Sequence, residues 1–299
     1  MSPRRNARAA APRAPVRRAS TRGRTRALGQ HFLRDRSVVD RIVDLVGPTA
    51  RDLVVEIGPG RGALTETLAA RAGRLLTLEI DAEMAANLQA RFAASSHVEV
   101  RQADARQFDY RTLRALAPDP TGRVLVVGNL PYSVGKPILA ALVEAAPAID
   151  EMALMLQKEV AERVAAEPGG KTYGALSVLT QVSVAARLAF LVSPGAFSPP
   201  PQVDSAVLHL RSHRQPPVPV ADPARFATVV RAAFGQRRKS LTNALAAGLG
   251  LGAERARRLI QAADIDPGRR AETLSLAEFA RLAAAPESSW RAGPPLPRG

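Results

Sequence analysis

Apolar runs of strand length alternate with segments of helical spacing along most of the chain, and this alternation constrains the fold more than any other feature. The apolar runs are bounded by Gly, Pro or polar residues, which is typical of buried strands. We predict strands at 53–57, 75–80, 97–101, 124–128 and 151–157, and helices at 37–46, 63–71, 82–93, 136–147, 158–166 and 174–182. Strands that alternate with helices in this way predict an α/β fold with a doubly wound parallel sheet.

The later part of the chain departs from this alternation. Residues 184–192 and 203–210 are predicted as strands with a Pro-rich turn and no full helix between them, so we expect an antiparallel pair that closes the sheet. Beyond a linker at 215–219 the chain is rich in Ala, Leu and Arg and has helical spacing. The expected organisation is an α/β domain over 28–214, a small all-α domain over 215–284 and a flexible tail over 285–299.

Residues 1–27 hold nine Arg and no acidic residue, and the whole chain has a formal net charge of +15. This segment is rich in Ala and Pro and has no apolar periodicity, so we expect a disordered basic arm. A basic arm commonly contacts the phosphates of nucleic acid. Two other interpretations stay open, namely a solvated tail and an organellar transit peptide, which is also rich in Arg and poor in acids.

Composition excludes several classes of site. The chain has no Cys, which excludes disulfides, a thiolate metal site and a Cys nucleophile. The chain has only four His residues, at positions 31, 97, 209 and 213, so we expect no metal site. No apolar run is long enough to cross a bilayer, and we therefore expect no membrane partner.

Three predicted strands end in residues that suit a nucleoside. Gly58–Gly62 joins the first strand to a helix with the spacing G-x-G-x-G, not the G-x-G-x-x-G of pyrophosphate binders. Glu79 ends the second strand, where an acid can accept hydrogen bonds from both ribose hydroxyls. Asp104 follows the third strand and can meet an adenine amino group. A nucleoside cradle without a phosphate site fits S-adenosyl-L-methionine, although each acid alone would be an ordinary surface residue.

Asn129-Leu130-Pro131-Tyr132 follows the fourth strand and suits a flat ring with an exocyclic amine. The side-chain oxygen of Asn129 and the carbonyl oxygen of Pro131 can each accept one hydrogen of an –NH2 group. Tyr132 offers a ring face for stacking. Beside a sulfonium methyl donor, this arrangement predicts N-methylation. The alternative is a strand-to-turn transition in which Asn129 is simply hydrogen-bonded.

Longer stretches extend these motifs into a family resemblance. The stretches are Leu28-Gly-Gln-His-Phe-Leu33, Val55-Glu-Ile-Gly-Pro-Gly-Arg-Gly-Ala-Leu-Thr65, Glu79-Ile-Asp81, Gly128-Asn-Leu-Pro-Tyr132, Met155-Leu-Gln-Lys-Glu-Val-Ala-Glu-Arg163, Lys171-Thr-Tyr-Gly174, Phe197-Ser-Pro-Pro-Pro-Gln-Val-Asp-Ser205 and Arg270-Ala-Glu-Thr-Leu-Ser-Leu276. Over about 28–284 the chain resembles the KsgA (RsmA) family of ribosomal RNA adenine N6,N6-dimethyltransferases. The resemblance implies a Rossmann-like S-adenosyl-L-methionine-dependent methyltransferase domain with a helical RNA-binding domain.

The resemblance also implies site residues. The expected cofactor contacts are His31, Leu33, Gly58, Gly60, Glu79, Asp104 and Asn129. The family usually has Asn at the position of His31, and His is larger although it can still donate and accept hydrogen bonds. The expected residues at the target adenine are Asn129, Pro131, Tyr132 and Phe197. Phe197 has an equally plain interpretation as a hydrophobic plug before Pro199-Pro-Pro201.

Basic residues are the candidates for RNA contact. Gln236-Arg237-Arg238-Lys239 is expected to begin a helix of the small domain, where it would bind phosphates, and the alternative is a solvated helix face. Lys136 and Lys171 are expected to flank the cleft. The target base must be unpaired or extruded to enter the pocket.

The function that we expect is dimethylation of two adjacent adenosines in a loop of small-subunit (16S) rRNA, on an immature small subunit, by a cytoplasmic monomer. An Erm-type methyltransferase of large-subunit rRNA is the nearest alternative, although Erm-like motifs tend to have Ile at the position of Leu130. A non-catalytic ribosome-assembly factor and a DNA adenine methyltransferase are further alternatives. The glycine loop, Glu79 and Asn129 argue against loss of cofactor binding.

Overall fold

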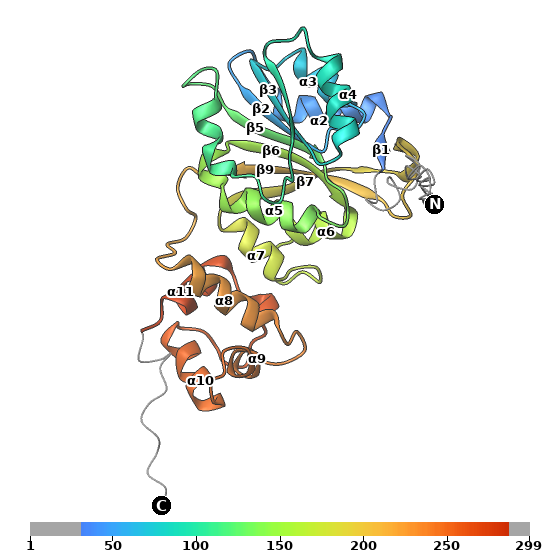
Figure 1. Cartoon of the computed structure of the whole chain (residues 1–299). Coiled ribbons are helices and arrows are strands. Elements are labelled where there is room, and N and C mark those ends of the chain that lie inside the picture. The colour runs from blue at the N-terminus through green and yellow to red at the C-terminus, as the bar shows by residue number, and fades with distance from the viewer. Residues whose placement is uncertain (1–30, 287–299) are drawn as a thin grey trace, which may run out of the picture.

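The computed structural model describes residues 31–286 (Figure 1). Seven strands form one sheet in the order β4-β3-β2-β5-β6-β9-β7. Neighbouring strands from β4 to β6 are parallel, whereas β9 is antiparallel to both β6 and β7. The strands are β2 (Leu53–Ile57), β3 (Arg74–Glu79), β4 (Val98–Gln102), β5 (Val124–Asn129), β6 (Glu151–Gln157), β7 (Val184–Val192) and β9 (Ser205–Ser212). The predicted α/β fold, with an antiparallel pair at one end of its sheet, is confirmed.

The central strands are buried on both faces, as strands of a parallel sheet usually are. Alternate residues of β2 and β5 point to opposite faces, so Val55 and Val126 enter one apolar cluster and Val54 and Val127 enter another. The helices that cover the sheet are α2 (Arg36–Val46), α3 (Thr65–Ala69), α4 (Ala82–Arg91), α5 (Gly135–Glu144) and α6 (Lys158–Val164). Helices α5 and α6 contribute to the first cluster, and α2 and α3 to the second.

Four further helices pack beneath the sheet layer in Figure 1 and form a helical domain. They are α8 (Pro223–Phe234), α9 (Leu241–Gly248), α10 (Ala253–Ala262) and α11 (Leu276–Ala284). Their shared core includes Phe226, Leu245 and Phe279, but it also takes Tyr173 and Val178 from the segment around α7 (Ala175–Gln181). The Tyr173 hydroxyl donates to the carbonyl of Leu274 at 3.1 Å. Helix α7 therefore packs with the helical domain although it precedes β7 of the sheet.

The basic run 236–239 does not begin a helix, which corrects the prediction. Helix α8 ends at Phe234 with Gly235 as its C-cap, and α9 begins only at Leu241 after Ser240. The intervening residues form a turn in which the amide of Lys239 donates to the carbonyl of Gln236 at 2.9 Å. The basic side chains are therefore presented by an exposed turn between two helices.

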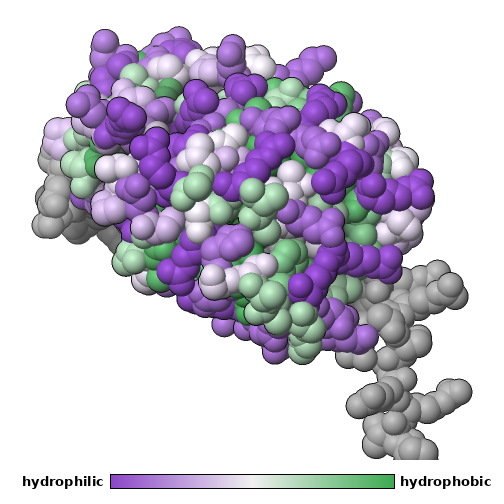
Figure 2. Space-filling model, turned by 90° about the horizontal axis from the view of Figure 1, so that it is seen from above, coloured by the Kyte–Doolittle hydropathy of each residue, from purple (hydrophilic) through white to green (hydrophobic). Residues whose placement is uncertain are grey.

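The face seen from above in Figure 2 is mainly hydrophilic, and its apolar side chains form scattered patches between charged and polar ones. Among the described residues, Leu191 and Val203 are large apolar side chains that are nearly half exposed. Isolated apolar residues of this kind are ordinary on a protein surface, so we assign them no role. Within residues 31–286 no helix combines the length and apolarity needed to cross a membrane.

The basic arm predicted for 1–27 and most of the tail predicted for 285–299 lie outside the described residues. A two-residue ribbon lies at the start of the described chain. Strand β1 (Phe32–Leu33) pairs antiparallel with β8 (Phe197–Ser198) and so joins the first described residues to the segment before β9. This ribbon brings His31 and Phe32 over the carboxyl ends of the sheet strands, where they line a cavity.

Candidate active site

A cavity of about 260 Å3 opens at the carboxyl ends of β2, β3 and β5. This is the edge at which open parallel sheets bind ligands. Its walls come from residues 31–33, 56–61, 63–64, 78–80, 103–106, 129–134 and 138. The structure thus gathers all seven residues that we expect to contact the cofactor, together with Pro131 and Tyr132 from the motif after β5.

The glycine loop lets the backbone pass close to the cavity. Gly58 and Gly60 have φ angles of +67° and +54°, in the left-handed region that favours glycine. A Cβ at Gly60 would lie 3.0 Å from the ring of Phe32, so the loop and the β1 ribbon touch at this point. The amide of Gly60 donates to a Glu79 carboxylate oxygen at 2.9 Å. The loop is therefore fastened to the end of the neighbouring strand.

Glu79 keeps free acceptor capacity although it is 2% exposed. Its other oxygen accepts from the amide of Asp81 at 2.9 Å, and the amide of Ile80 is a further backbone donor to this carboxylate, whose two oxygens together have four lone pairs. Burial raises the pKa of Glu79, and the hydrogen bonds from Asp81 and Gly60 oppose that rise. The acceptor capacity that remains suits the hydroxyls of a ribose.

The carboxylate of Asp104 is already hydrogen-bonded to Arg106, a residue that the sequence analysis did not predict for the site. Both of its carboxylate oxygens are held by Arg106, with side-chain distances of 2.6 to 3.1 Å and an amide contact of 2.9 Å. The hydrogen bond from the Arg106 side chain lowers the pKa of Asp104, which is therefore ionised at neutral pH. An adenine amino group would meet a carboxylate that already has a guanidinium partner.

Glu56 is a second missed residue, and it also lines the cavity. It is 1% exposed, and burial raises its pKa to about 8. The Thr65 hydroxyl donates to it at 2.6 Å and opposes that rise. Its signal in the sequence is an acid inside the otherwise apolar run Val54-Val-Glu-Ile57.

The lining residues fit S-adenosyl-L-methionine. Three carboxyl groups, on Glu56, Glu79 and Asp104, provide acceptors for hydroxyl, amino and ammonium groups. The left-handed glycines at 58 and 60 leave space that any Cβ would narrow. These features suit a nucleoside joined to an amino acid.

Asn129 has a defined amide orientation. Its side-chain nitrogen donates to the backbone carbonyl of His31 at 2.9 Å, so its side-chain oxygen is the atom left to accept. The carbonyl of Pro131 accepts from the amide of Val134 at 3.1 Å and retains one lone pair. Both acceptors that we predict for an exocyclic amine are thus present in the cavity wall.

Tyr132 is held at two places. Its hydroxyl lies 2.7 Å from the Oγ atom of Ser205, and its ring centroid lies 5.7 Å from that of His31. The Nδ1 atom of His31 lies 2.9 Å from the carbonyl oxygen of Pro199. Because a carbonyl only accepts, Nδ1 carries the hydrogen. Ser205 is a further residue that sequence reasoning missed, since nothing in a Ser at the start of a strand indicates a partner 73 positions earlier.

Phe197 does not lie where the resemblance implies. Its side chain is 2% exposed and packs in the apolar cluster that contains Leu33 and Val192, and it is not among the lining residues of the cavity. Strand β8 pairs with β1 so that Phe197 lies opposite Leu33, which belongs to the same buried cluster. In this structure the hydrophobic-plug interpretation holds, which corrects the placement expected beside the target base.

The five predicted RNA-binding residues separate into two places. Lys136 is exposed in the first turn of α5, next to the lining residue Val134. Lys171 lies instead at the helical domain, where its carbonyl accepts from the guanidinium of Arg237. Arg237 also lies 3.5 Å from a carboxylate oxygen of Glu272. Lys171 therefore does not line the cavity and belongs with the basic turn.

Arg238 and Lys239 are the cations of this turn that remain available. Both are exposed, and neither side chain forms an ion pair or hydrogen bond with another residue of the range 31–286. Unpaired cations at an exposed turn can contact phosphates without first breaking a bond. Of the predicted basic run, these two side chains are the best candidates for RNA contact.

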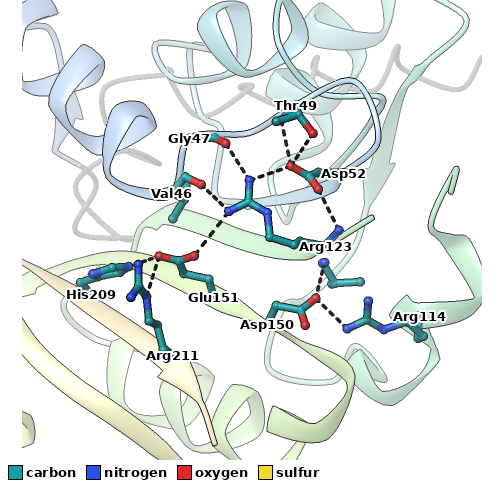
Figure 3. A network of polar contacts seen from close by, with 11 residues as sticks. Val46, Gly47, Thr49, Asp52, Arg114, Arg123, Asp150, Glu151, His209 and Arg211 are labelled. Carbon is teal, nitrogen blue, oxygen red and sulfur yellow. Dashed lines mark hydrogen bonds and ion pairs between the residues drawn. The ribbon is translucent and has the colours of Figure 1, made fainter. Parts of the chain in front are cut away.

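A polar network at the opposite end of the sheet is structural (Figure 3). Arg123 lies 2.8 Å from Asp52 and 3.5 Å from Glu151, and Glu151 also contacts Arg211 and His209. Burial lowers the pKa of His209, so its imidazole is neutral at pH 7. The network joins the amino ends of β5 and β6, away from the cavity at their carboxyl ends.

The fold and the cavity together define a class. A parallel sheet with an antiparallel end, a glycine loop after β2, an acid at the end of β3 and another after β4 are the features of S-adenosyl-L-methionine-dependent methyltransferases. A family model described as ribosomal RNA adenine dimethylase matches residues 22–285. The chain belongs to the ribosomal RNA adenine dimethylase family, which confirms the resemblance.

Relatives and solved structures agree with this membership. The chain is 43% identical to the ribosomal RNA small subunit methyltransferase A of Chromohalobacter salexigens, over 85% of this chain and 88% of the relative. It is 45% identical to the protein of the same name from Xanthomonas axonopodis pv. citri, over 86% and 94%. The 23S rRNA methyltransferase ErmE is 26% identical with a TM-score of 0.64, over 85% of this chain and 98% of that one. A dimethyladenosine transferase from Plasmodium falciparum, at 23% identity, shares the fold with a TM-score of 0.70, over 84% and 96%.

Proposed function

We propose that the protein transfers methyl groups from S-adenosyl-L-methionine to N6 of two adjacent adenosines in a loop of small-subunit rRNA, giving N6,N6-dimethyladenosine. The proposed substrate is an immature small ribosomal subunit, and the protein acts on it as a monomer in the cytoplasm. Relatives named as small-subunit enzymes are 43–45% identical, whereas the large-subunit enzyme ErmE is 26% identical, which supports the small subunit as target.

The orientation of Asn129 is the observation that carries this proposal. One hydrogen of its side-chain nitrogen bonds the His31 carbonyl and fixes the amide, and its side-chain oxygen can only accept a hydrogen bond from a ligand. A donor-rich group such as an exocyclic amine matches that oxygen, whereas a carbonyl oxygen at the same place would be repelled. The Pro131 carbonyl supplies a second acceptor close by in the chain. The pair distinguishes adenine from bases that lack an amine at this position.

The chain's own groups would act on the amine nitrogen. S-adenosyl-L-methionine supplies an electrophilic methyl group on a sulfonium centre. Asn129 and Pro131 accept the amine hydrogens and so favour a pyramidal nitrogen with its lone pair directed outward. Positive charge that develops on this nitrogen during attack strengthens both hydrogen bonds, which lowers the barrier. No general base is required, because the nitrogen becomes acidic as it is methylated.

Two surfaces would contact the RNA. Lys136 lies in the first turn of α5 between the lining residues Val134 and Ile138, and Arg238 and Lys239 lie in the turn between α8 and α9 of the helical domain. Phosphate contacts of this kind fix the register of the RNA and carry little sequence information. The adenosine itself would be recognised in the cavity after it leaves its stack.

The test is methyl transfer by the purified protein with labelled cofactor. Immature small subunits and naked large-subunit rRNA are offered separately, and we expect label in N6,N6-dimethyladenosine of the first only. Asn129→Ala should lower the rate at least ~100-fold, because one transition-state acceptor is lost. Gln89→Ala, on the exposed side of α4, serves as the control.

Each outcome separates one of the alternatives. Label in large-subunit rRNA alone would make the protein an Erm-type enzyme and refute the proposal. Label in duplex DNA but not in RNA would assign it to DNA. Binding of small subunits without any label, in wild type and in Asn129→Ala alike, would indicate a non-catalytic assembly factor.

A further inference from the structure

The hydroxyl of Tyr132 is anchored to a strand that lies two places away in the sheet. Tyr132 follows β5, whereas Ser205 begins β9, and β6 lies between these strands. The two oxygen atoms are 2.7 Å apart. Ser205 is fully buried, and its backbone pairs with Gln157 on one side and Val192 on the other. The anchor is thus a buried residue that is paired with a strand on each side.

The side of the same ring is held by His31. The two ring centroids are 5.7 Å apart with an interplanar angle of 37°. His31 is itself fixed, because its Nδ1 hydrogen bonds the carbonyl of Pro199 and its backbone carbonyl accepts from Asn129. The ring of Tyr132 is therefore restrained at its tip by Ser205 and along its side by His31.

Restraint of this ring matters for the chemistry at Asn129. A base that stacks on Tyr132 takes its plane from the plane of the ring. Its amine meets the acceptors on Asn129 and Pro131 only if that plane is correct, and small misplacements of reacting atoms are costly in rate. A Tyr side chain without its tip contact can turn about its side-chain torsions.

We propose that Ser205 is a positioning residue for methyl transfer, which fixes the Tyr132 ring in the orientation that stacks the target adenine. It does not touch the base. This inference deepens the proposed function and rests on it.

Within the described residues, the hydroxyl of Ser205 is not needed for pairing of the sheet. Among residues 31–286, the contact of its Oγ atom is with Tyr132, whereas the sheet uses its backbone. Ser212, at the other end of the same strand, has an Oγ atom without a hydrogen-bond partner in the described chain. Ser212→Ala is therefore a matched control for Ser205→Ala.

The first test is steady-state methylation of immature small subunits. We expect Ser205→Ala to lower kcat by about 3- to 10-fold, the range of one net hydrogen bond, with cofactor affinity unchanged. Tyr132→Phe removes the same bond from the other side, so the double variant should be no slower than Tyr132→Phe alone. Additive losses in the double variant, or wild-type kcat in both single variants, would overturn the proposal.

The second test measures stacking of the target base on Tyr132 by fluorescence. An RNA fragment of the loop carries 2-aminopurine at the target position, and stacking on Tyr132 quenches its fluorescence. Quenching should be weaker in Ser205→Ala and Tyr132→Phe than in wild type and Ser212→Ala. Equal quenching in all four proteins would contradict the positioning role. If the wild-type protein neither binds nor methylates small-subunit RNA, both the proposed function and this inference are wrong. If the wild-type protein is active and the variants behave like it, only the positioning role is wrong.

Discussion

At the scale of single residues, hydrogen-bond partners decide what each side chain of the cavity can do. The bond from its nitrogen to the His31 carbonyl fixes the side-chain amide of Asn129, whose oxygen can accept a hydrogen bond. The carboxylate of Asp104 is already bonded to Arg106. The residue types at these positions could be predicted from the sequence. The long-range partner could not, because Ser205 lies 73 positions from Tyr132 and meets the site only through the fold. Arg106, by contrast, is a local partner that lies two positions after Asp104.

Glu56 gives a prediction for stability against pH. Its folded-state pKa of about 8 lies above the ordinary value of 4.5, so the folded protein binds the proton more tightly than the unfolded chain does. Stability should therefore fall as pH rises from 4.5 to about 8 and stay constant above. Without cofactor, Glu56→Gln should be more stable than wild type at pH 9 by roughly 1–4 kcal/mol, and the difference should shrink towards pH 5.

The measurement is urea unfolding at several pH values between 5 and 9. Glu144→Gln, at the exposed end of α5, is the control and should keep the wild-type pH profile. A Glu56→Gln profile that runs parallel to that of wild type would show that Glu56 is ionised in the folded protein throughout.

At the scale of elements, strands could be predicted better than helix ends. The five parallel strands were predictable to within one or two residues, because a buried strand requires an uninterrupted apolar run. Helix α3 is shorter than the predicted 63–71, because Gly62 has a φ of +84° and the residues before Thr65 form turns. The basic run 236–239 looked like a helix start, but Gly235 and Ser240 place it in a turn.

The glycine loop gives a prediction at this scale. In Gly60→Ala the new Cβ would press on the Phe32 ring and occupy a left-handed conformation. We expect a loss of roughly 1 kcal/mol in stability and about tenfold weaker binding of S-adenosylhomocysteine by calorimetry. Gly250→Ala has the same backbone cost with nothing within 4 Å, so it should lose stability and keep its affinity. Equal affinities for the two variants would show that the loop–ribbon contact does not shape the cavity.

At the scale of the whole molecule, the helical domain is joined to the sheet domain through α7 and the segment before it. Gly169 donates its amide to the carbonyl of Glu272 at 2.7 Å, and Arg237 contacts both Lys171 and Glu272. The family resemblance could predict that a helical domain exists. It could not predict that Arg237 is already paired, because the pairing requires a loop 66 residues earlier in the chain.

This pairing predicts different salt dependences for neighbouring cations. Each phosphate contact contributes about 0.7–0.9 to the slope of log K against log salt concentration. In a variant with Arg238 and Lys239 replaced by Gln, the slope for small-subunit binding should be smaller by the contribution of about one to two phosphate contacts. Arg237→Gln should leave the slope unchanged, since its guanidinium is held within the protein. A reduced slope in Arg237→Gln would place Arg237 on the RNA instead.

The central claim is the identity of the methylated RNA, and mass spectrometry of rRNA from a strain that lacks this protein tests it most directly. We expect two adjacent N6,N6-dimethyladenosines to revert to adenosine in small-subunit rRNA, with the large-subunit rRNA unchanged. Complementation with the wild-type chain should restore both modifications, and Asn129→Ala should restore neither. An unchanged small-subunit rRNA, with a methyl group missing from the large subunit, would contradict the account.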